Sequence, residues 1–184
     1  MNNIADILQA ILIGLVVANF LLNTGRALKG IEVCKECLIF LNNKVLKTEG
    51  GIFKLLHIGI YKTIFREYCL IPDHAKALKY GGKLLDIYLE RGQKDEKGAL
   101  TVKLAGIYQQ QYKYLEAREL YEKAINITKK MGDRKIEAYT NEKAGIISYY
   151  LGDYGKAKQY ILRKHLPSDY KLATKREKQQ ITQT

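Results

Sequence analysis

A self-similarity with a period of 40 residues runs from about Ile64 to Leu166 of this 184-residue chain. Residues 40 positions apart match in several sets, namely Ala77, Ala117 and Ala157; Gly92 and Gly132; Tyr68 and Tyr108; Tyr114 and Tyr154; Ile107 and Ile147. A fixed period in this range marks a repeat architecture, in which each unit buries its apolar face by stacking on the next. The period therefore restricts the chain to folds made of repeated supersecondary units.

Apolar residues at helical spacing predict about eight helices. We expect them at about 3–22, 26–41, 52–70, 73–90, 95–111, 114–130, 134–150 and 154–165. No stretch shows sustained alternation of apolar and polar residues bounded by turn residues, so the sequence contains no indication of a sheet. Gly132-Asp133 and Gly152-Asp153 each combine a helix end with a helix start.

The unit 98–131 carries small and aromatic residues at the positions typical of a known repeat. Leu104 and Ala105 are followed by Tyr108 in its first helix, and the second helix holds Ala117, Tyr121 and Ala124. The next unit has Ala144, Gly145, Ser148, Ala157, Ile161 and Lys164 at these positions, and the preceding unit has Ile64, Phe65, Tyr68, Ala77, Gly81 and Leu84. Small residues allow close helix approach, and large ones fill the gaps between helices.

On these residues the chain resembles the tetratricopeptide repeat (TPR) family. The segment Leu151–Ala157 is most similar to the 40-residue subclass found in Pins-type G-protein-signalling modulators. The resemblance implies an all-α, antiparallel helix-hairpin solenoid that works as a non-catalytic scaffold or adaptor without a cofactor. It implies a repeat core of Tyr68, Ala77, Leu104, Ala105, Tyr108, Ala117, Tyr121, Ala124, Gly145 and Ala157.

The resemblance also implies a partner site, because the first helices of TPR units line a concave groove. The matching positions are Lys62, Arg66, Cys69, Val102, Gly106, Gln109, Tyr139, Glu142, Ile146 and Tyr149. Lys62 and Arg66 lie one turn apart and share a helix face, where they could pair with acidic side chains of a peptide. Gly106 and Ile146 replace the asparagine that Pins-type repeats carry after Leu-Gly.

The formal net charge of +12 favours an acidic partner. Acidic peptides, nucleic acid and an anionic membrane surface all meet this requirement, and a solvated helical surface also explains the charge. A basic nucleic-acid-binding repeat is one alternative, since tyrosines can stack on bases. Tyr108, Tyr114 and Tyr121 are expected in the repeat core, however, so nucleic acid is the weaker interpretation.

The first segment leaves two main interpretations open. The uncharged run from Ile7 to Thr24 has 18 residues, the threshold for a membrane-spanning helix. Arg26 and Lys29 follow it, as on the cytoplasmic side of an anchor. Asp6, Gln9 and Asn19 favour instead a first helix buried between other helices, and without a basic stretch before the apolar part a cleaved signal is the weakest option.

Three cysteines, Cys34, Cys37 and Cys69, argue against a secreted disulfide scaffold and for a reducing, cytoplasmic compartment. Cys34 and Cys37 form a CxxC within a helical pattern, without the second pair or the histidines that zinc requires. No Ser/His/Asp set, phosphate-binding loop or carboxylate pair is present, so we expect neither an enzyme nor a metal site.

These patterns divide the chain into four parts. They are an apolar helix at 1–22, a divergent hairpin with an insertion at 24–63, TPR-like repeats at 64–166 and a basic polar tail at 167–184. The last repeat ends at His165-Leu166-Pro167 without a polar capping helix. This ending predicts an exposed apolar face and self-association.

Overall fold

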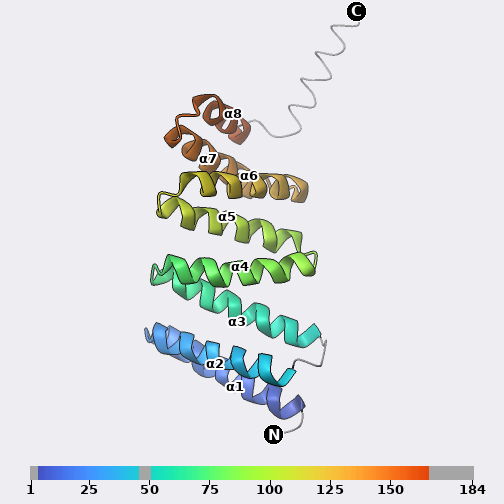
Figure 1. Cartoon of the computed structure of the whole chain (residues 1–184). Coiled ribbons are helices and arrows are strands. Elements are labelled where there is room, and N and C mark those ends of the chain that lie inside the picture. Colours follow the sequence, from blue (N-terminus) through green and yellow to red (C-terminus); the bar gives the residue numbers. More distant parts are fainter. Residues whose placement is uncertain (1–3, 46–50, 166–184) are drawn as a thin grey trace, which may run out of the picture. The chain divides into compact units, whose positions relative to one another are not determined.

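A computed structural model describes residues 4–45 and 51–165, and every described element is an α-helix or a turn (Figure 1). The helices are α1 (Ile4–Asn23), α2 (Ala27–Val45), α3 (Gly51–Leu70), α4 (His74–Glu90), α5 (Lys94–Gln110), α6 (Tyr114–Met131), α7 (Arg134–Tyr150) and α8 (Tyr154–His165). The predicted all-α fold of about eight helices is confirmed. The largest difference between a predicted and an observed helix boundary is at the end of α2. The predicted tail at 167–184 lies outside the described residues.

The helix starts explain the 40-residue period. Helices α4 to α8 begin at residues 74, 94, 114, 134 and 154, one start every 20 residues. Each period therefore contains two helices and two turns, and each turn has two or three residues. Three of these turns place a glycine in the left-handed region, with φ of 65° at Gly92, 74° at Gly132 and 75° at Gly152.

Aspartates begin the helices that follow several of these turns. The Asp133 carboxylate accepts hydrogen bonds from the backbone N–H groups of Lys135 and Ile136, at 3.0 and 3.1 Å. Asp153 accepts one from the N–H of Lys156 at 3.1 Å. These contacts satisfy N–H groups that the first helical turn leaves without a partner.

The chain forms two compact units, residues 1–87 and 88–184. The boundary falls within α4, inside the segment 64–166 that the sequence predicts as one array. Unit 1 contains the antiparallel pair α1 and α2, with α3 packed on α2. In Figure 1 this pair is drawn in blue. The α3–α4 hairpin of this unit is joined by stacked rings of Tyr68 and Tyr80, with centroids 5.8 Å apart.

Two glycines let α1 and α2 approach closely. A Cβ atom on Gly14 would lie 2.5 Å from the Cys37 sulfur. One on Gly30 would lie 2.7 Å from the Leu22 side chain and 3.1 Å from the backbone oxygen of Ala18. Any side chain at either position would push the helices apart, so the glycines hold this hairpin together.

The expectation that the first helix is buried between other helices is wrong for one of its sides. Ile7, Ile11 and Ala18 are buried. The other side carries exposed apolar side chains, namely Leu12, Ile13, Val16, Val17 and Phe20. The reason is that α2 covers one side of α1 and leaves the opposite side open.

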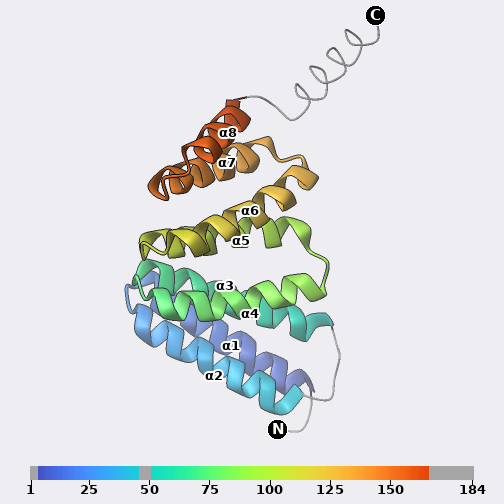
Figure 2. The same ribbon diagram turned by 45° about the horizontal axis from the view of Figure 1, so that its top comes forward.

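Unit 2 consists of the hairpins α5–α6 and α7–α8, with α6 packed on α7 (Figure 2). Its core combines small and large side chains: Val102, Ala105, Ala117, Tyr121, Ala124, Ile125, Ala144, Ile147 and Tyr160. Gly145 closes the α7–α8 contact, since a Cβ there would lie 3.4 Å from the backbone oxygen of Ala157. The alanines set the helix spacing and the tyrosines fill the remaining volume.

The α1–α2 contact leads to a stability prediction. We expect Gly30→Ala to destabilise the chain by about 1–3 kcal/mol, because the new methyl group overpacks the interface. Gly59→Ala is the matched control: a methyl group on Gly59, in α3, would have no atom within 4 Å, so higher helix propensity should stabilise this variant by roughly 0.5–1 kcal/mol. Urea denaturation followed by circular dichroism measures both, and equal midpoints would contradict the close approach.

Candidate protein-interaction surface

The first helices of the two hairpins in unit 2, α5 and α7, contact each other and carry most of the predicted partner-binding residues. Gly106 and Gln109 of α5 are partly exposed, as is Glu142 of α7. Tyr139 and Tyr149 of α7 are exposed, Tyr139 to 49%. We refer to these five residues as the α5/α7 surface.

Val102 does not face outward with the rest of the predicted set. It is only 9% exposed and belongs to the core cluster of unit 2. An apolar, β-branched side chain at this position packs against the hairpin and supports the surface from below. Val102 is therefore a packing residue rather than a contact for a partner.

Tyr121 forms the floor of the α5/α7 surface. Its ring comes from α6 and is buried, and its hydroxyl donates a hydrogen bond to Gln109 Oε1 at 3.1 Å. Burial raises the pKa of Tyr121 far above its usual range, and the neighbouring Tyr139 raises it further. The phenol therefore stays neutral and remains a hydrogen-bond donor at any physiological pH. The sequence identified Tyr121 only as a core residue, because helical periodicity predicts that the ring is buried but not which residue its hydroxyl group contacts.

Gly106 leaves space above this floor. A Cβ atom there would meet only the Tyr121 hydroxyl, at 3.7 Å, which is an ordinary contact. On the neighbouring helix, the Lys143 ammonium lies 5.2 Å from the centre of the Tyr139 ring, within the range of a cation–π interaction. The surface thus combines an open position, a buried donor, and an aromatic ring with a cation beside it.

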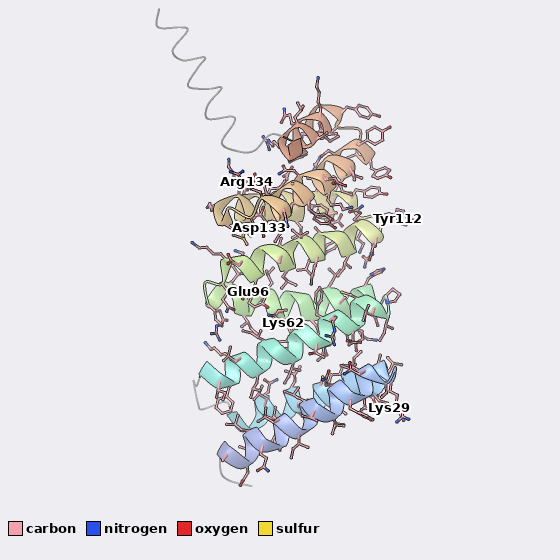
Figure 3. The ribbon with its side chains drawn as sticks, turned by 180° about the vertical axis from the view of Figure 1, so that it is seen from behind. Lys29, Lys62, Glu96, Tyr112, Asp133 and Arg134 are labelled. Atoms are coloured by element: carbon pink, nitrogen blue, oxygen red, sulfur yellow. The ribbon has the colours of Figure 1, made fainter. Side chains whose placement is uncertain are left out.

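Lys62 and Arg66 lie on α3, in unit 1, so they belong to a different unit from the α5/α7 surface (Figure 3). Both side chains are exposed. Arg66 is already engaged: its Nη2 and Nε lie 2.8 and 2.9 Å from Glu67 Oε1. Because the Glu67 side chain is only 8% exposed, Arg66 compensates a nearly buried carboxylate.

The predicted repeat-core residues are placed as follows. Tyr68, Ala77, Leu104, Ala105, Ala117, Tyr121, Ala124, Gly145 and Ala157 are buried, and Tyr108 is partly buried against the core of unit 2. The second tyrosine of that core, Tyr160, was not predicted. Its hydroxyl donates to Glu122 Oε1 at 2.9 Å. Burial, followed by the interaction with Glu122, raises the pKa of Tyr160 to about 12.

The CxxC cysteines are packing residues of unit 1. Cys34 and Cys37 are both buried and neither forms a disulfide. Burial raises the pKa of the Cys34 thiol to about 11, with smaller contributions from Cys37 and Glu67. Within the described residues, no group of three or more His, Cys, Asp or Glu side chains is arranged to hold a metal ion.

The solved structures to which the chain is similar include TPR proteins. The chain is similar to a Signal Transduction ATPase with Numerous Domains protein with a tetratricopeptide repeat sensor from Pyrococcus horikoshii (TM-score 0.67, 19% identity, 84% of this chain and 23% of that one). It is also similar to the apo form of RapI (TM-score 0.69, 16% identity, 82% of this chain and 40% of that one). A third is a putative kinesin light chain with nearly identical TPR-like repeats from Podosopora anserina (TM-score 0.58, 18% identity, 84% of this chain and 76% of that one).

These likenesses show a TPR-like fold. The chain spans less than half the length of the first two proteins. No protein-family model matches the sequence, and no curated protein sequence matches it. The Pins-type subclass that the sequence resembles is not singled out by the structural similarities.

The burial of the CxxC predicts its reactivity. At pH 8 a thiol with a pKa of about 11 is a thiolate in about one molecule per thousand, against about one in ten for an ordinary cysteine with a pKa of 9.0. We expect the exposed Cys69 to react rapidly with Ellman's reagent, and Cys34 and Cys37 to react only on unfolding. Cys69→Ser should remove the fast phase, and three equally fast thiols would contradict the burial.

The raised pKa of Cys34 also makes the stability of the folded chain depend on pH. The Cys34 thiol keeps its proton to a higher pH in the folded chain than in the unfolded chain. The contribution of this thiol to the free energy of unfolding is therefore complete below pH 9 and is lost as the pH rises from about 9 to 11. Cys34→Ala should lose less stability than the wild-type chain across this interval.

Proposed function

We propose that the chain is a non-catalytic protein-interaction module, an adaptor or scaffold, that binds a protein or peptide on the α5/α7 surface. The observation that supports it best is the exposed Tyr139 beside the Tyr121–Gln109 hydrogen bond, with a second exposed tyrosine, Tyr149, further along α7. Tyrosine is among the residue types that carry most of the binding energy in protein interfaces.

Gly106 supports a groove at this place. A side chain at position 106 would extend over the Tyr121 hydroxyl, and the glycine leaves the Tyr121–Gln109 hydrogen bond without a side chain above it at that position. The side-chain amide of Gln109, whose oxygen accepts from Tyr121, could donate an N–H to a peptide carbonyl there, while the Tyr139 ring would pack against an apolar side chain. Hydrogen bonding and aromatic contact would thus act on the same short segment.

An acidic partner fits the charges of the module. The chain has a formal net charge of +12, and Lys143 places an ammonium group over the Tyr139 ring. A glutamate or aspartate of the partner would meet this cation at the edge of the surface. Lys62 and Arg66 of unit 1 provide further positive charge, although Arg66 is shared with Glu67.

A non-catalytic role is supported by where the shifted groups lie. Cys34, Tyr121 and Tyr160 have raised pKa values because they are buried in helix contacts. None of these groups is an acid–base pair set in a cleft. We also propose a cytoplasmic location, since the free thiols suit a reducing compartment.

A pair of substitutions at Gly106 tests the surface. Peptides that bind the full chain are first selected from a displayed library of random peptides. We expect Gly106→Phe to weaken the selected peptides at least about tenfold, because the ring would cover the Tyr121 hydroxyl. Gly106→Ala should bind as the wild type does, since its methyl group makes only an ordinary contact.

The selection also tests the chemistry of the partner. Selected peptides should be rich in aspartate and glutamate and should bind more weakly in 0.5 M salt, as expected for exposed charges. Peptides that bind wild type and Gly106→Phe equally would contradict the α5/α7 surface. A selection without acidic enrichment would contradict the acidic partner alone.

A second candidate is the same module tethered to a membrane through α1. The segment Ala5–Asn23 is long and apolar enough to cross a bilayer. Its side away from α2 exposes Leu12, Val16 and Phe20, and Arg26 and Lys29 follow it. Because α2 carries several charges and packs tightly on α1, attachment by the exposed side retains more of unit 1 than complete insertion.

Vesicle flotation separates the two candidates. If α1 is a tether, the full chain should float with vesicles containing phosphatidylserine and stay floating in 0.5 M salt, because apolar burial holds it. The double variant Val16→Asp, Phe20→Asp should remain at the bottom of the gradient. A wild-type chain that stays at the bottom and elutes as a dimer would contradict the tether and assign the exposed side of α1 to self-association.

A further inference from the structure

Five tyrosines from two repeats meet at the edge of unit 2 where the α5–α6 and α7–α8 turns lie. They are Tyr112, Tyr114, Tyr150, Tyr149 and Tyr154, and we refer to them as the tyrosine row. Figure 3 shows Tyr112 at this edge. Tyr114, Tyr150 and Tyr154 lie at helix ends, so the row follows from the repeat itself.

The rings form a continuous series. Tyr112 meets Tyr114 edge to face at 6.2 Å, and Tyr114 stacks on Tyr150 at 5.2 Å with planes only 8° apart. Tyr150 then meets Tyr149 at 6.2 Å, and Tyr149 meets Tyr154 at 5.4 Å, both edge to face. Alternating stacked and perpendicular rings produce ridges and shallow gaps rather than a flat surface.

This series is open to solvent. Tyr112 is 79% exposed and Tyr154 64% exposed, and Tyr149 and Tyr150 are also exposed. Four exposed aromatic rings, joined through Tyr114, form a larger apolar patch than scattered surface residues do, and such patches mark interaction sites. Packing within unit 2 does not account for the row, because most of its area faces outward.

The backbone at Tyr112 supports the same conclusion. Its φ of 59° lies in the left-handed region, where the other turns of unit 2 have Gly92, Gly132 and Gly152. A side chain at this φ is strained, and burial does not compensate for the strain because Tyr112 is exposed. A strained, exposed aromatic residue in place of glycine indicates that its ring is used for binding.

The charges around the row are balanced and do not favour a strongly charged partner. The neighbouring stretches are balanced: residues 110–119 carry Lys113 and Arg118 with Glu116 and Glu119, and residues 149–156 carry Lys156 with Asp153. Arg118 and Lys156 both lie within 4 Å of the Asp153 carboxylate. The surplus positive charge of the chain is thus located elsewhere, and this edge presents phenol rings and hydroxyl groups.

We propose that the tyrosine row is a second binding surface, which takes a proline-rich segment in the polyproline II conformation. Such a segment is uncharged, has apolar rings and exposes backbone carbonyls without proline N–H groups, so it needs hydrogen-bond donors from its partner. The row supplies those donors as phenol hydroxyls. The ring spacing of 5.2–6.2 Å is close to the rise of two polyproline II residues, about 6.2 Å.

This surface is independent of the proposed acidic-peptide function, apart from Tyr149, which both include. The test therefore uses Tyr112 and Tyr154. The Tyr112→Gly, Tyr154→Ser variant should remain folded, because glycine suits the φ at position 112 and Tyr154 is exposed at a helix start. Tyr139→Ala is the matched control, since Tyr139 is an exposed tyrosine of unit 2 outside the row.

The probe is a dye-labelled decaproline peptide, titrated with the full chain by fluorescence anisotropy. We expect saturable binding that changes less than about twofold between 0.15 and 0.5 M salt, since neither partner contributes charge there. The double variant should weaken the dissociation constant at least about tenfold, and Tyr139→Ala less than about twofold. Decaproline should also protect Tyr112 and Tyr154 from acetylation by N-acetylimidazole.

Three results would overturn the proposal. The first is no decaproline binding at millimolar protein, and the second is equal binding by the double variant and the wild type. The third is a row that binds dye-labelled oligouridylate in a strongly salt-dependent way while decaproline does not compete. Loss of acidic-peptide binding in Gly106→Phe with decaproline binding retained would separate the two surfaces.

Discussion

Close approach between helices at small residues is the constraint on which both units depend. In unit 1 the pair Gly14 and Gly30 brings α1 against α2, and in unit 2 Gly145 brings α7 against α8. The fully buried Ala105, Ala117 and Ala144 extend this spacing through the core of unit 2. Once the backbones are this close, the space between them holds only a few large side chains, and the helix spacing determines where these side chains lie.

Tyrosines occupy much of that remaining volume, and this choice has consequences at the surface. A buried tyrosine needs a partner for its hydroxyl, so Tyr121 reaches Gln109 and Tyr160 reaches Glu122. The hydroxyls therefore end at the borders of the core, beside exposed helix faces. The α5/α7 surface exists because a packing residue of α6 presents its polar end between two other helices.

Much of the fold could be predicted from the sequence because the repeat is regular. A glycine followed by an aspartate at 132–133 fixed one helix end and the next start, and the structure places both there. The burial of α1 could not be predicted, because composition shows how apolar a helix is but not how many neighbours cover it. Only the packing of the folded chain shows that α2 leaves Val16 and Phe20 exposed.

The surfaces were less predictable than the fold. Family positions led to Gly106 and Tyr139, which are accessible, and also to Val102, which is buried. A one-residue difference in helix rotation decides between these outcomes, and periodicity does not resolve it. The tyrosine row was missed because it joins residues of different hairpins, such as Tyr114 and Tyr150, whose contact depends on how the two hairpins stack.

The hydrogen bond between Tyr160 and Glu122 links α8 to α6 across the intervening helix. The Arg118–Asp153 ion pair joins α6 to the start of α8 at 3.8 Å. Opening α8 alone would leave the Glu122 carboxylate without the phenol and would uncover the core next to Ala144. We therefore expect that the last helix does not fray as an independent end, and that α6, α7 and α8 unfold cooperatively with amide protons that exchange with solvent as one group.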